Sequence, residues 1–271
     1  MADDAQALLR DGRLTDALAA QAAAVRSAPT AIGARWFYAE LLCLAGDHDR
    51  ADRMLDIVAS QAADRQPAAE RFRQILRGEE IRRQVLTEGR APRLVGAGVA
   101  GLQPVAEALL LTRTGRPAEA LACLAADDPS PAGPGRRNGA PFAGFRDLDD
   151  LLARLVEVIT PEGDYCWTMA GDIARLAIQP LARPRDLIWR PAQIEIRGGF
   201  AGEIWLPALY VGPVERMDDA LRLGRRTDWI EEPDAPVRGL GLRSYLIDDD
   251  DVPIHELGTI EFDHDLPAAH P

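Results

Sequence analysis

The arrangement of apolar and polar positions divides the chain into two parts. Residues 1–126 hold Ala- and Leu-rich runs in which apolar positions recur every three or four residues, the spacing of amphipathic helices. Residues 142–271 hold short β-branched or aromatic runs separated by Gly, Pro and Asp, which is typical of strands. Between them, residues 127–141 (DDPSPAGPGRRNGAP) are so rich in Pro and Gly that we expect an exposed linker rather than helix or sheet. The pattern predicts two domains, 1–126 and 142–271.

A repeat is visible in the first part. Three segments share the pattern Gly-x4-Ala, in which the glycine and alanine are Gly12 and Ala17, Gly46 and Ala51, and Gly115 and Ala120. The first two glycines are 34 residues apart and the last two are 69 apart, close to twice that spacing. Thirty-four residues is the period of the tetratricopeptide (TPR) repeat, in which glycine ends the first helix and a small residue lets the second pack closely.

The alternative is an alanine-rich helical bundle without repeats, but the period, the glycines, the alanines and Pro29 together favour TPR-like units. Between Arg65 and Gly101 the signature is missing, and we expect a degenerate helical pair there. Stacked repeats form a superhelix with a concave groove suited to a partner helix or peptide.

The groove residues can be inferred from residues 31–46. The more apolar stripe of this predicted helix is expected to be core and consists of Phe37, Leu41 and Leu44. A second stripe at i, i+4 and i+7 consists of Trp36, Glu40 and Cys43. We therefore expect the groove to be lined by the remaining candidates, Arg35, Tyr38 and Leu42. The alternative is that Arg35 and Tyr38 pack against the next repeat.

The second part predicts an α+β domain with a mixed or antiparallel sheet. Residues 145–159 place Leu and Val at helical spacing behind Asp147 and Asp149, so we expect an amphipathic helix there. Residues 218–224 are expected to form a short helix. The predicted strands are DYCWTM, IARLAI, AQIEIR, EIWLPALYV, LRSYLID and GTIEF.

Charge and composition narrow the functional classes. The formal net charge is −12, and residues 127–271 carry all of it, with 15 arginines against 27 acidic residues. We therefore expect no binding to nucleic acid or to a membrane surface. The chain has no lysine, which excludes Schiff-base chemistry and a Walker A lysine. With an acidic start, three scattered cysteines and no long apolar run, it is expected to be cytoplasmic and without a disulfide framework.

Catalytic and metal-binding motifs are not recognisable. The sequence lacks a G-x-G-x-x-G loop after a strand and a G-x-S-x-G turn. The segment HELGTIEFDHD gathers metal-ligand residue types, but strand alternation explains it better as an acidic edge opposite Ile260 and Phe262. The run Asp248–Asp251 is expected to be a charged turn because it lacks EF-hand spacing. We therefore predict no cofactor, no metal and no enzymatic activity.

The chain resembles, over essentially its whole length, the ImpE/TagJ/SciE family of type VI secretion accessory proteins. The resemblance rests on the strings RDLDDLLARLVEVITPEGDYCW, RPRDLIWRPAQIEI, EIWLPALYVG, LRLGRRTDW, VRGLGLRSYLIDDDD and LGTIEF, in this order. It implies a non-enzymatic adaptor that binds the N-terminal helix of the small contractile-sheath subunit. It also implies a link to sheath recycling by the AAA-plus disassembly ATPase.

Two of these strings carry a cluster of charged and aromatic residues, namely Arg183, Arg185, Asp186, Trp189, Arg190, Arg225, Asp228 and Trp229. Arginine forms bidentate pairs with carboxylates and stacks on indole rings. We expect an internal ion-pair and cation–π network that joins the sheet, the helix and the TPR-like part. The alternatives are an exposed clamp for an acidic partner, or the site of a hydrolase or nucleotide-dependent enzyme.

Overall fold

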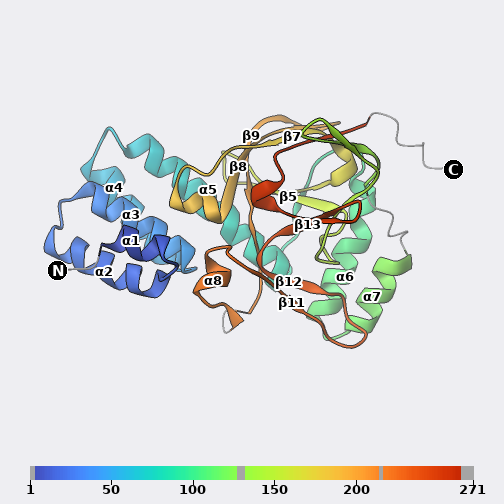
Figure 1. The fold of residues 1–271 in the computed structure, drawn as a ribbon, viewed down its shortest axis with the longest axis horizontal. Coiled ribbons are helices and arrows are strands. Elements are labelled where there is room, and N and C mark those ends of the chain that lie inside the picture. The colour runs from blue at the N-terminus through green and yellow to red at the C-terminus, as the bar shows by residue number, and fades with distance from the viewer. Residues whose placement is uncertain (1–3, 127–131, 214–215, 264–271) are drawn as a thin grey trace.

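The chain runs from a block of helices into a sheet-rich block (Figure 1). The computed structural model describes residues 4–126, 132–213 and 216–263. The predicted fold class is confirmed: an N-terminal helical region precedes a C-terminal α+β region built on a mixed sheet.

The first four helices form two helix–turn–helix pairs, which we call the helical block: α1 (Ala5–Arg10), α2 (Leu14–Ser27), α3 (Ile32–Leu44) and α4 (His48–Gln61). Gly12 and Gly46 follow the first helix of each pair with φ of +82° and +80°, a left-handed conformation that favours glycine. Ala17 and Ala51 are fully buried, so each second helix packs closely on the first. The Gly-x4-Ala signature therefore has the structural meaning that the sequence predicted.

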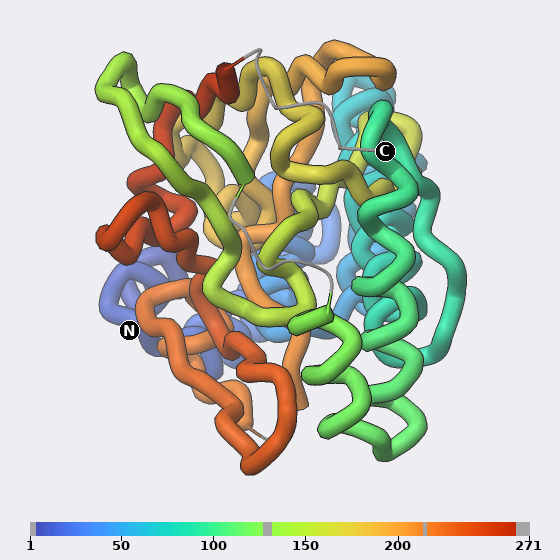
Figure 2. The backbone as a smooth tube through the Cα atoms, turned by 90° about the vertical axis from the view of Figure 1, so that its right-hand side faces the viewer, coloured from blue at the N-terminus to red at the C-terminus, as the bar shows by residue number. Residues whose placement is uncertain are grey.

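A third pair with the same signature is α6 (Gln103–Arg113) and α7 (Pro117–Ala126). Gly115 has φ of +75° and Ala120 is fully buried. This pair does not stack on the first two. Figure 2 shows it along one flank of the sheet-rich block, with the first helices behind.

The degenerate helical pair expected between Arg65 and Gly101 was wrong. Residues 66–88 form one long helix, α5 (Gln66–Glu88), which ends at Gly89 with φ of +91°. Beyond the first turn no proline interrupts this stretch, and its internal glycine, Gly78, has a packing role. A Cβ on Gly78 would lie 2.4 Å from Ile159 Cγ2, so the glycine lets α5 approach the sheet. The helix spans the two blocks (Figure 1).

After α5 come β1 (Arg93–Leu94) and a 3-10 turn, η1 (Val99–Leu102). The largest sheet has the order β1-β6-β5-β9-β8-β7-β15-β2-β3, with β1 and β6 parallel and the other pairs antiparallel. Its remaining strands are β2 (Gly135–Arg137), β3 (Ala140–Phe142), β5 (Leu155–Ile159), β6 (Tyr165–Met169), β7 (Ile173–Ile178), β8 (Trp189–Ile196), β9 (Ala201–Pro207) and β15 (Thr259–Phe262).

Two small antiparallel sheets complete the block. One consists of β10 (Leu209–Tyr210), β12 (Arg238–Leu242) and β11 (Thr227–Ile230), and the other of β14 (Asp250–Pro253), β13 (Ser244–Ile247) and β4 (Phe145–Asp147). The predicted short helix is present as α8 (Asp219–Arg222). In the described residues, three further 3-10 turns are η2 (Ala170–Asp172), η3 (Pro184–Leu187) and η5 (Ile254–Glu256).

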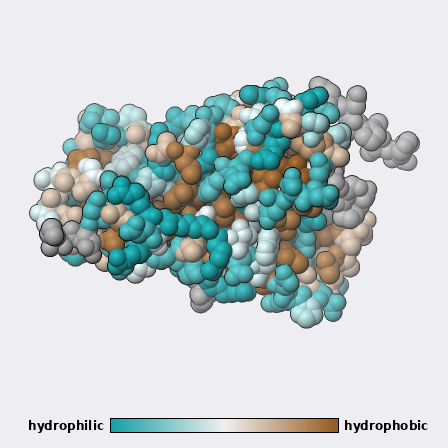
Figure 3. Space-filling model, in the orientation of Figure 1, coloured by the Kyte–Doolittle hydropathy of each residue, from teal (hydrophilic) through white to brown (hydrophobic). Residues whose placement is uncertain are grey.

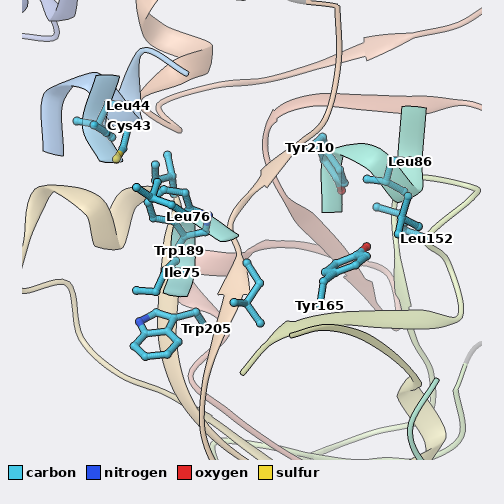
Figure 4. Close-up of a cluster of buried hydrophobic side chains, with 14 of the residues drawn as sticks. Cys43, Leu44, Ile75, Leu76, Leu86, Leu152, Tyr165, Trp189, Trp205 and Tyr210 are labelled. Atoms are coloured by element: carbon cyan, nitrogen blue, oxygen red, sulfur yellow. The ribbon is translucent and has the colours of Figure 1, made fainter. Parts of the chain in front are cut away.

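The large sheet is covered on both faces. On β5, Leu155 and Ile159 belong to the core shared with the helices, whereas Val156 and Val158 belong to a second core with the small β4-β13-β14 sheet. All five β5 residues are buried. Figure 4 shows part of the first core, where Cys43 and Leu44 of α3 lie beside Leu76 of α5.

The amphipathic helix expected over residues 145–159 was wrong. The segment forms β4, a turn and β5. A strand that is buried on both faces reads as a continuous apolar run, which periodicity does not distinguish from a helix. The two aspartates do not serve a helix start: Asp147 Oδ1 accepts from Asp149 N and Asp149 Oδ1 accepts from Leu151 N, which builds the turn.

The linker expected at residues 127–141 lies partly outside the described residues, which resume at Ala132. Where it is described, residues 135–142 form the β2–β3 hairpin at the sheet edge instead of irregular chain. Asn138 and Gly139 adopt positive φ and make the two-residue turn that an Asn-Gly pair favours. The division into domains 1–126 and 142–271 stays a prediction, although β1 pairs with β6 across it.

Candidate functional site

A cleft lies where α3, α5 and the sheet block meet, and we call it the junction cleft. Its volume is about 480 Å³. One wall consists of the end of α3 and one face of α5, and the other consists of the start of β8, the segment 209–213 and Met217. The lining residues are Cys43, Leu44, Ala45, Gly46, His48, Glu79, Arg82, Arg83, Thr87, Ile188, Trp189, Leu209, Tyr210, Val211, Gly212, Pro213, Met217 and Arg222.

Most of the wall is apolar. Ile188, Leu209, Val211, Pro213 and Met217 line one side with aliphatic surface. The face of the molecule in Figure 3 is largely polar, with apolar residues gathered in separate patches. A concave apolar surface with a few charged groups is the usual character of a ligand or peptide site.

The charged groups in the floor of the cleft are already paired. Arg82 is 3% exposed, and its Nη1 lies 3.1 Å from Glu79 Oε1. Arg82 Nη2 also donates to Leu209 O at 2.8 Å. The other oxygen of Glu79 accepts from Trp189 Nε1 at 2.9 Å. The floor therefore offers no free acid or base at these two positions.

Beneath the floor, α5 is joined to β5 by a fully buried ion network. Arg82 Nε donates to Glu157 Oε1 at 2.8 Å, and Glu157 also accepts from Arg243 and from the Tyr165 hydroxyl. Burial by itself would raise the pKa of Glu157, but the two guanidinium groups outweigh it and hold that pKa well below its usual value. Glu157 is therefore a carboxylate with two fixed cationic partners.

A second buried carboxylate behaves differently. Burial raises the pKa of Asp147 to about 7, because Arg243 offsets the burial only in part and Asp149 adds a second negative charge. Asp147 Oδ1 lies 2.8 Å from the Tyr210 hydroxyl, whereas Arg243 Nε is 3.5 Å from Oδ2. The pKa of Asp147 therefore lies near neutral pH, although its side chain is buried in a packed region.

The predicted arginine cluster contacts the helical block through Arg185, which is buried, and through Arg225, which is exposed. Arg185 Nη1 lies 2.9 Å from Glu40 Oε1 of α3, and both side chains are less than 10% exposed. The guanidinium also lies over the ring of Phe72 at 4.4 Å and of Trp36 at 5.6 Å. Trp189, four residues on, packs edge-to-face on Phe72. Thus η3 packs on α3 and contacts Trp36 and Glu40.

The rest of the predicted cluster is spread out. Asp186 Oδ2 accepts from the backbone N–H of Ala182 and of Arg183 and so caps η3. The remaining four residues of the cluster do not contact α3 as Arg185 does. Arg190 is buried and donates to Gln179 O; Arg225 donates to Leu9 O and Arg10 O; Asp228 accepts from Trp229 N; and Trp229 lies 5.9 Å from Tyr210.

The expected groove residues are not on an open surface. Arg35, Tyr38 and Leu42 are 8%, 7% and 1% exposed. Arg35 donates to Pro29 O at 2.5 Å, and the Tyr38 hydroxyl accepts from Arg50 of α4. We expected these side chains to line a groove, but the rotation of α3 turns them toward its neighbouring helices. This correction removes them as exposed partner contacts.

Sequence reasoning missed Glu40, Glu79 and Glu157. Glu40 and Glu157 are single acidic residues in otherwise apolar runs, as in LVEVI around Glu157, whereas Glu79 stands in a charged run. Such isolated charges are a usable signal, because a buried carboxylate requires a paired cation. The sequence did not reveal which arginine serves each one.

Metal and membrane features are not evident in the part of the chain that the structure describes. Within those residues, no group of three or more His, Cys, Asp or Glu side chains is arranged to hold a metal ion. The predicted acidic edge has Ile260 and Phe262 buried, while Glu261 pairs with Arg175; His264 lies outside the described residues. Among the described helices, none has the length and apolar content needed to span a membrane.

Comparison with known proteins gives consistent matches. Residues 139–261 match the family described as ImpE protein. The chain is 35% identical over 260 residues to the type VI secretion system accessory component TagJ of Pseudomonas aeruginosa, covering 96% of this chain and 91% of that protein. The crystal structure of protein VPA1032 from Vibrio parahaemolyticus is similar with a TM-score of 0.88 and 26% identity, over 97% of this chain and 98% of that one.

Proposed function

The chain belongs to the ImpE family, whose relative TagJ is a type VI secretion accessory component, and from this we propose that it is a non-enzymatic adaptor of that system. In this proposal its partner is the N-terminal helix of the small contractile-sheath subunit, and the AAA-plus disassembly ATPase acts on the sheath in the same cycle. The adaptor needs no cofactor.

We assign the partner helix to the junction cleft. The observation that carries this assignment is the combination of an apolar cleft of about 480 Å³ with a floor whose charges are paired internally. An amphipathic helix inserts apolar anchors into such a groove and keeps its polar face toward solvent. The surface of α3 around Glu40 is less suitable because Arg185 of η3 already covers it.

The lining of the cleft also includes two further arginines beside the apolar wall. They are Arg83 and Arg222. Arg83 is about half exposed and pairs with both Glu80 and Glu88 on α5, so its charge is already compensated by its own helix. Charges at the rim of an interface steer association and set orientation more than they add affinity.

Titration of the full chain with a synthetic peptide of the sheath subunit's N-terminal helix tests this function. Val211→Gln places a polar group on the apolar wall, where a bound helix would leave it without a partner, and is expected to weaken binding by roughly tenfold. The matched control is Leu181→Gln, because Leu181 is 47% exposed and lies outside the cleft.

Two results would overturn these assignments separately. If the wild-type chain does not bind the peptide at micromolar concentration, the proposed partner is wrong. If the Val211→Gln variant binds as tightly as the Leu181→Gln variant, the partner is retained but the junction cleft is not its site.

A further inference from the structure

Three side chains of the segment around α8 contact the ends of three different helices. They are spaced three residues apart: Asp219, Arg222 and Arg225. Asp219 accepts from the backbone N–H and the hydroxyl of Thr15, both at 3.1 Å, at the start of α2. Arg222 Nη1 donates to Ala45 O at the end of α3. Arg225 Nη2 donates to Leu9 O at 3.0 Å and to Arg10 O at 2.6 Å at the end of α1.

Each contact matches the charge of the helix end that it meets. The first turn of a helix presents unpaired N–H groups and partial positive charge, and the last turn presents unpaired carbonyls and partial negative charge. The carboxylate meets a helix start, and the two guanidinium groups meet helix ends. The segment is therefore complementary to the turns of both repeat units.

Gly12 makes room for Arg225, whereas Gly46 lies beside Arg222 at a distance that a Cβ would also allow. A Cβ on Gly12 would lie 2.6 Å from Arg225 Nη1, and one on Gly46 would lie 3.9 Å from Arg222 Nη1. The equivalent Gly115 of the third pair has no such neighbour within 4 Å. The first two turns of the repeat thus serve as docking points for the sheet block, in addition to closing their helix pairs.

The same segment is continuous with a wall of the junction cleft. Met217, two residues before Asp219, lines the cleft, and Arg222 both lines the cleft and bonds to Ala45 of the opposite wall. The contacts of this segment with α1, α2 and α3 therefore hold the two walls of the junction cleft at a fixed separation. Arg225 takes part in these contacts although it does not line the cleft.

We propose that Asp219, Arg222 and Arg225 are positioning residues that set the width of the junction cleft and thereby its affinity for the partner helix. This inference rests on the proposed function, because the affinity concerns the same cleft. It assigns the helix-end contacts a role in recognition that is separate from holding the chain together.

The experiment compares two neighbouring arginines in the full-length chain. Arg225→Ala removes the contact with α1, whereas Arg226→Ala removes only a surface pair with Asp218. Peptide affinity is measured well below the melting temperature of each variant. Arg225→Ala is expected to weaken binding about fivefold, Arg225→Lys to restore it to within about twofold because an ammonium still donates to the carbonyls, and Arg226→Ala to leave it unchanged.

Amide hydrogen exchange in the free protein gives a readout that does not depend on the partner. Arg225→Ala is expected to accelerate exchange at residues 43–46 and 209–213, and Arg226→Ala is not. Faster exchange with unchanged peptide affinity would overturn the positioning role, and so would unchanged exchange. A wild-type chain that does not bind the peptide would remove the proposed function, while the exchange data would still decide whether the anchors fix the cleft walls.

Discussion

The helices are tied to the sheet block by two sets of polar contacts that differ in burial. Under the cleft, Arg82 of α5, Glu157 and Arg243 are all at most 3% exposed. At the outer edge, Arg225 is exposed and bonds to backbone carbonyls. When a buried charge loses its partner, no water can solvate it, so the loss is costly. When an exposed charge loses its partner, water solvates it instead and the cost is small. The first set therefore determines whether the chain folds, and the second can adjust its geometry at small cost.

The largest effect is expected at Glu157. Glu157→Gln leaves Arg82 and Arg243 buried without their shared counter-charge, which should lower the free energy of unfolding by about 3–5 kcal/mol. Urea denaturation measures the loss. The control is Glu203→Gln, whose carboxylate pairs with Arg71 at the surface and should matter little. If Glu157→Gln lowers the free energy of unfolding no more than Glu203→Gln does, the buried contacts do not stabilise the fold more than the exposed ones.

A smaller loss is expected at the α3 contact. Arg185→Ala strands Glu40 and removes the stacking on Phe72, which should cost about 3 kcal/mol, while peptide affinity changes less than stability does. Arg175→Ala is the control, because its pair with Glu261 is half exposed. Thermal melting and peptide titration are compared for both variants. If Arg185→Ala melts like the wild type yet loses the partner, Arg185 is a binding clamp and not an internal contact.

The smallest effect concerns pH and Asp147. Its folded pKa of about 7 lies above the value of an unfolded aspartate, so the folded chain holds this proton where the unfolded chain has released it. This contribution to stability is therefore lost as the pH rises from about 4 to about 7. Between pH 5 and 7 one proton accounts for at most about 2.7 kcal/mol.

The test is the difference in unfolding free energy between pH 5 and 7. Asp147→Asn keeps the acceptor for Tyr210 and should flatten this part of the profile. Asp228→Asn, at an exposed carboxylate, should leave it as in the wild type. An unchanged slope in Asp147→Asn would show that the buried carboxyl group is not the source.

The sequence was most informative where local chemistry decides the structure. Gly12, Gly46 and Gly115 predicted the three helix turns because only a residue without a Cβ adopts positive φ at low cost. Seven of the fifteen described strands, β6–β10, β13 and β15, were also predicted, because their β-branched and aromatic runs are typical of strands. Residues 145–159 were misassigned because burial on both faces removes the alternation that identifies a strand.

The candidate site was predicted only in part. The strings RPRDLIWRP and LRLGRRTDW drew attention to Arg185, Trp189 and Arg225, all of which contact residues of the helices. Their partners could not be inferred, because Glu40 and Arg185 are 145 residues apart and a pair at that separation leaves no local pattern. The rotation of α3 was also misjudged, since Arg35 and Tyr38 are long side chains that bury against neighbouring helices.

By itself the sequence determined the order of the two regions, helices first and strands second, together with the repeat turns and the family, because these depend on local periodicity, backbone freedom and characteristic strings. Only the tertiary structure decided that α5 is one long helix against the sheet, that η3 packs on α3, and that a cleft lies between the helices and the sheet block. Those features arise from contacts between distant segments, where packing and the pairing of buried charges select one arrangement from many that the same local pattern allows.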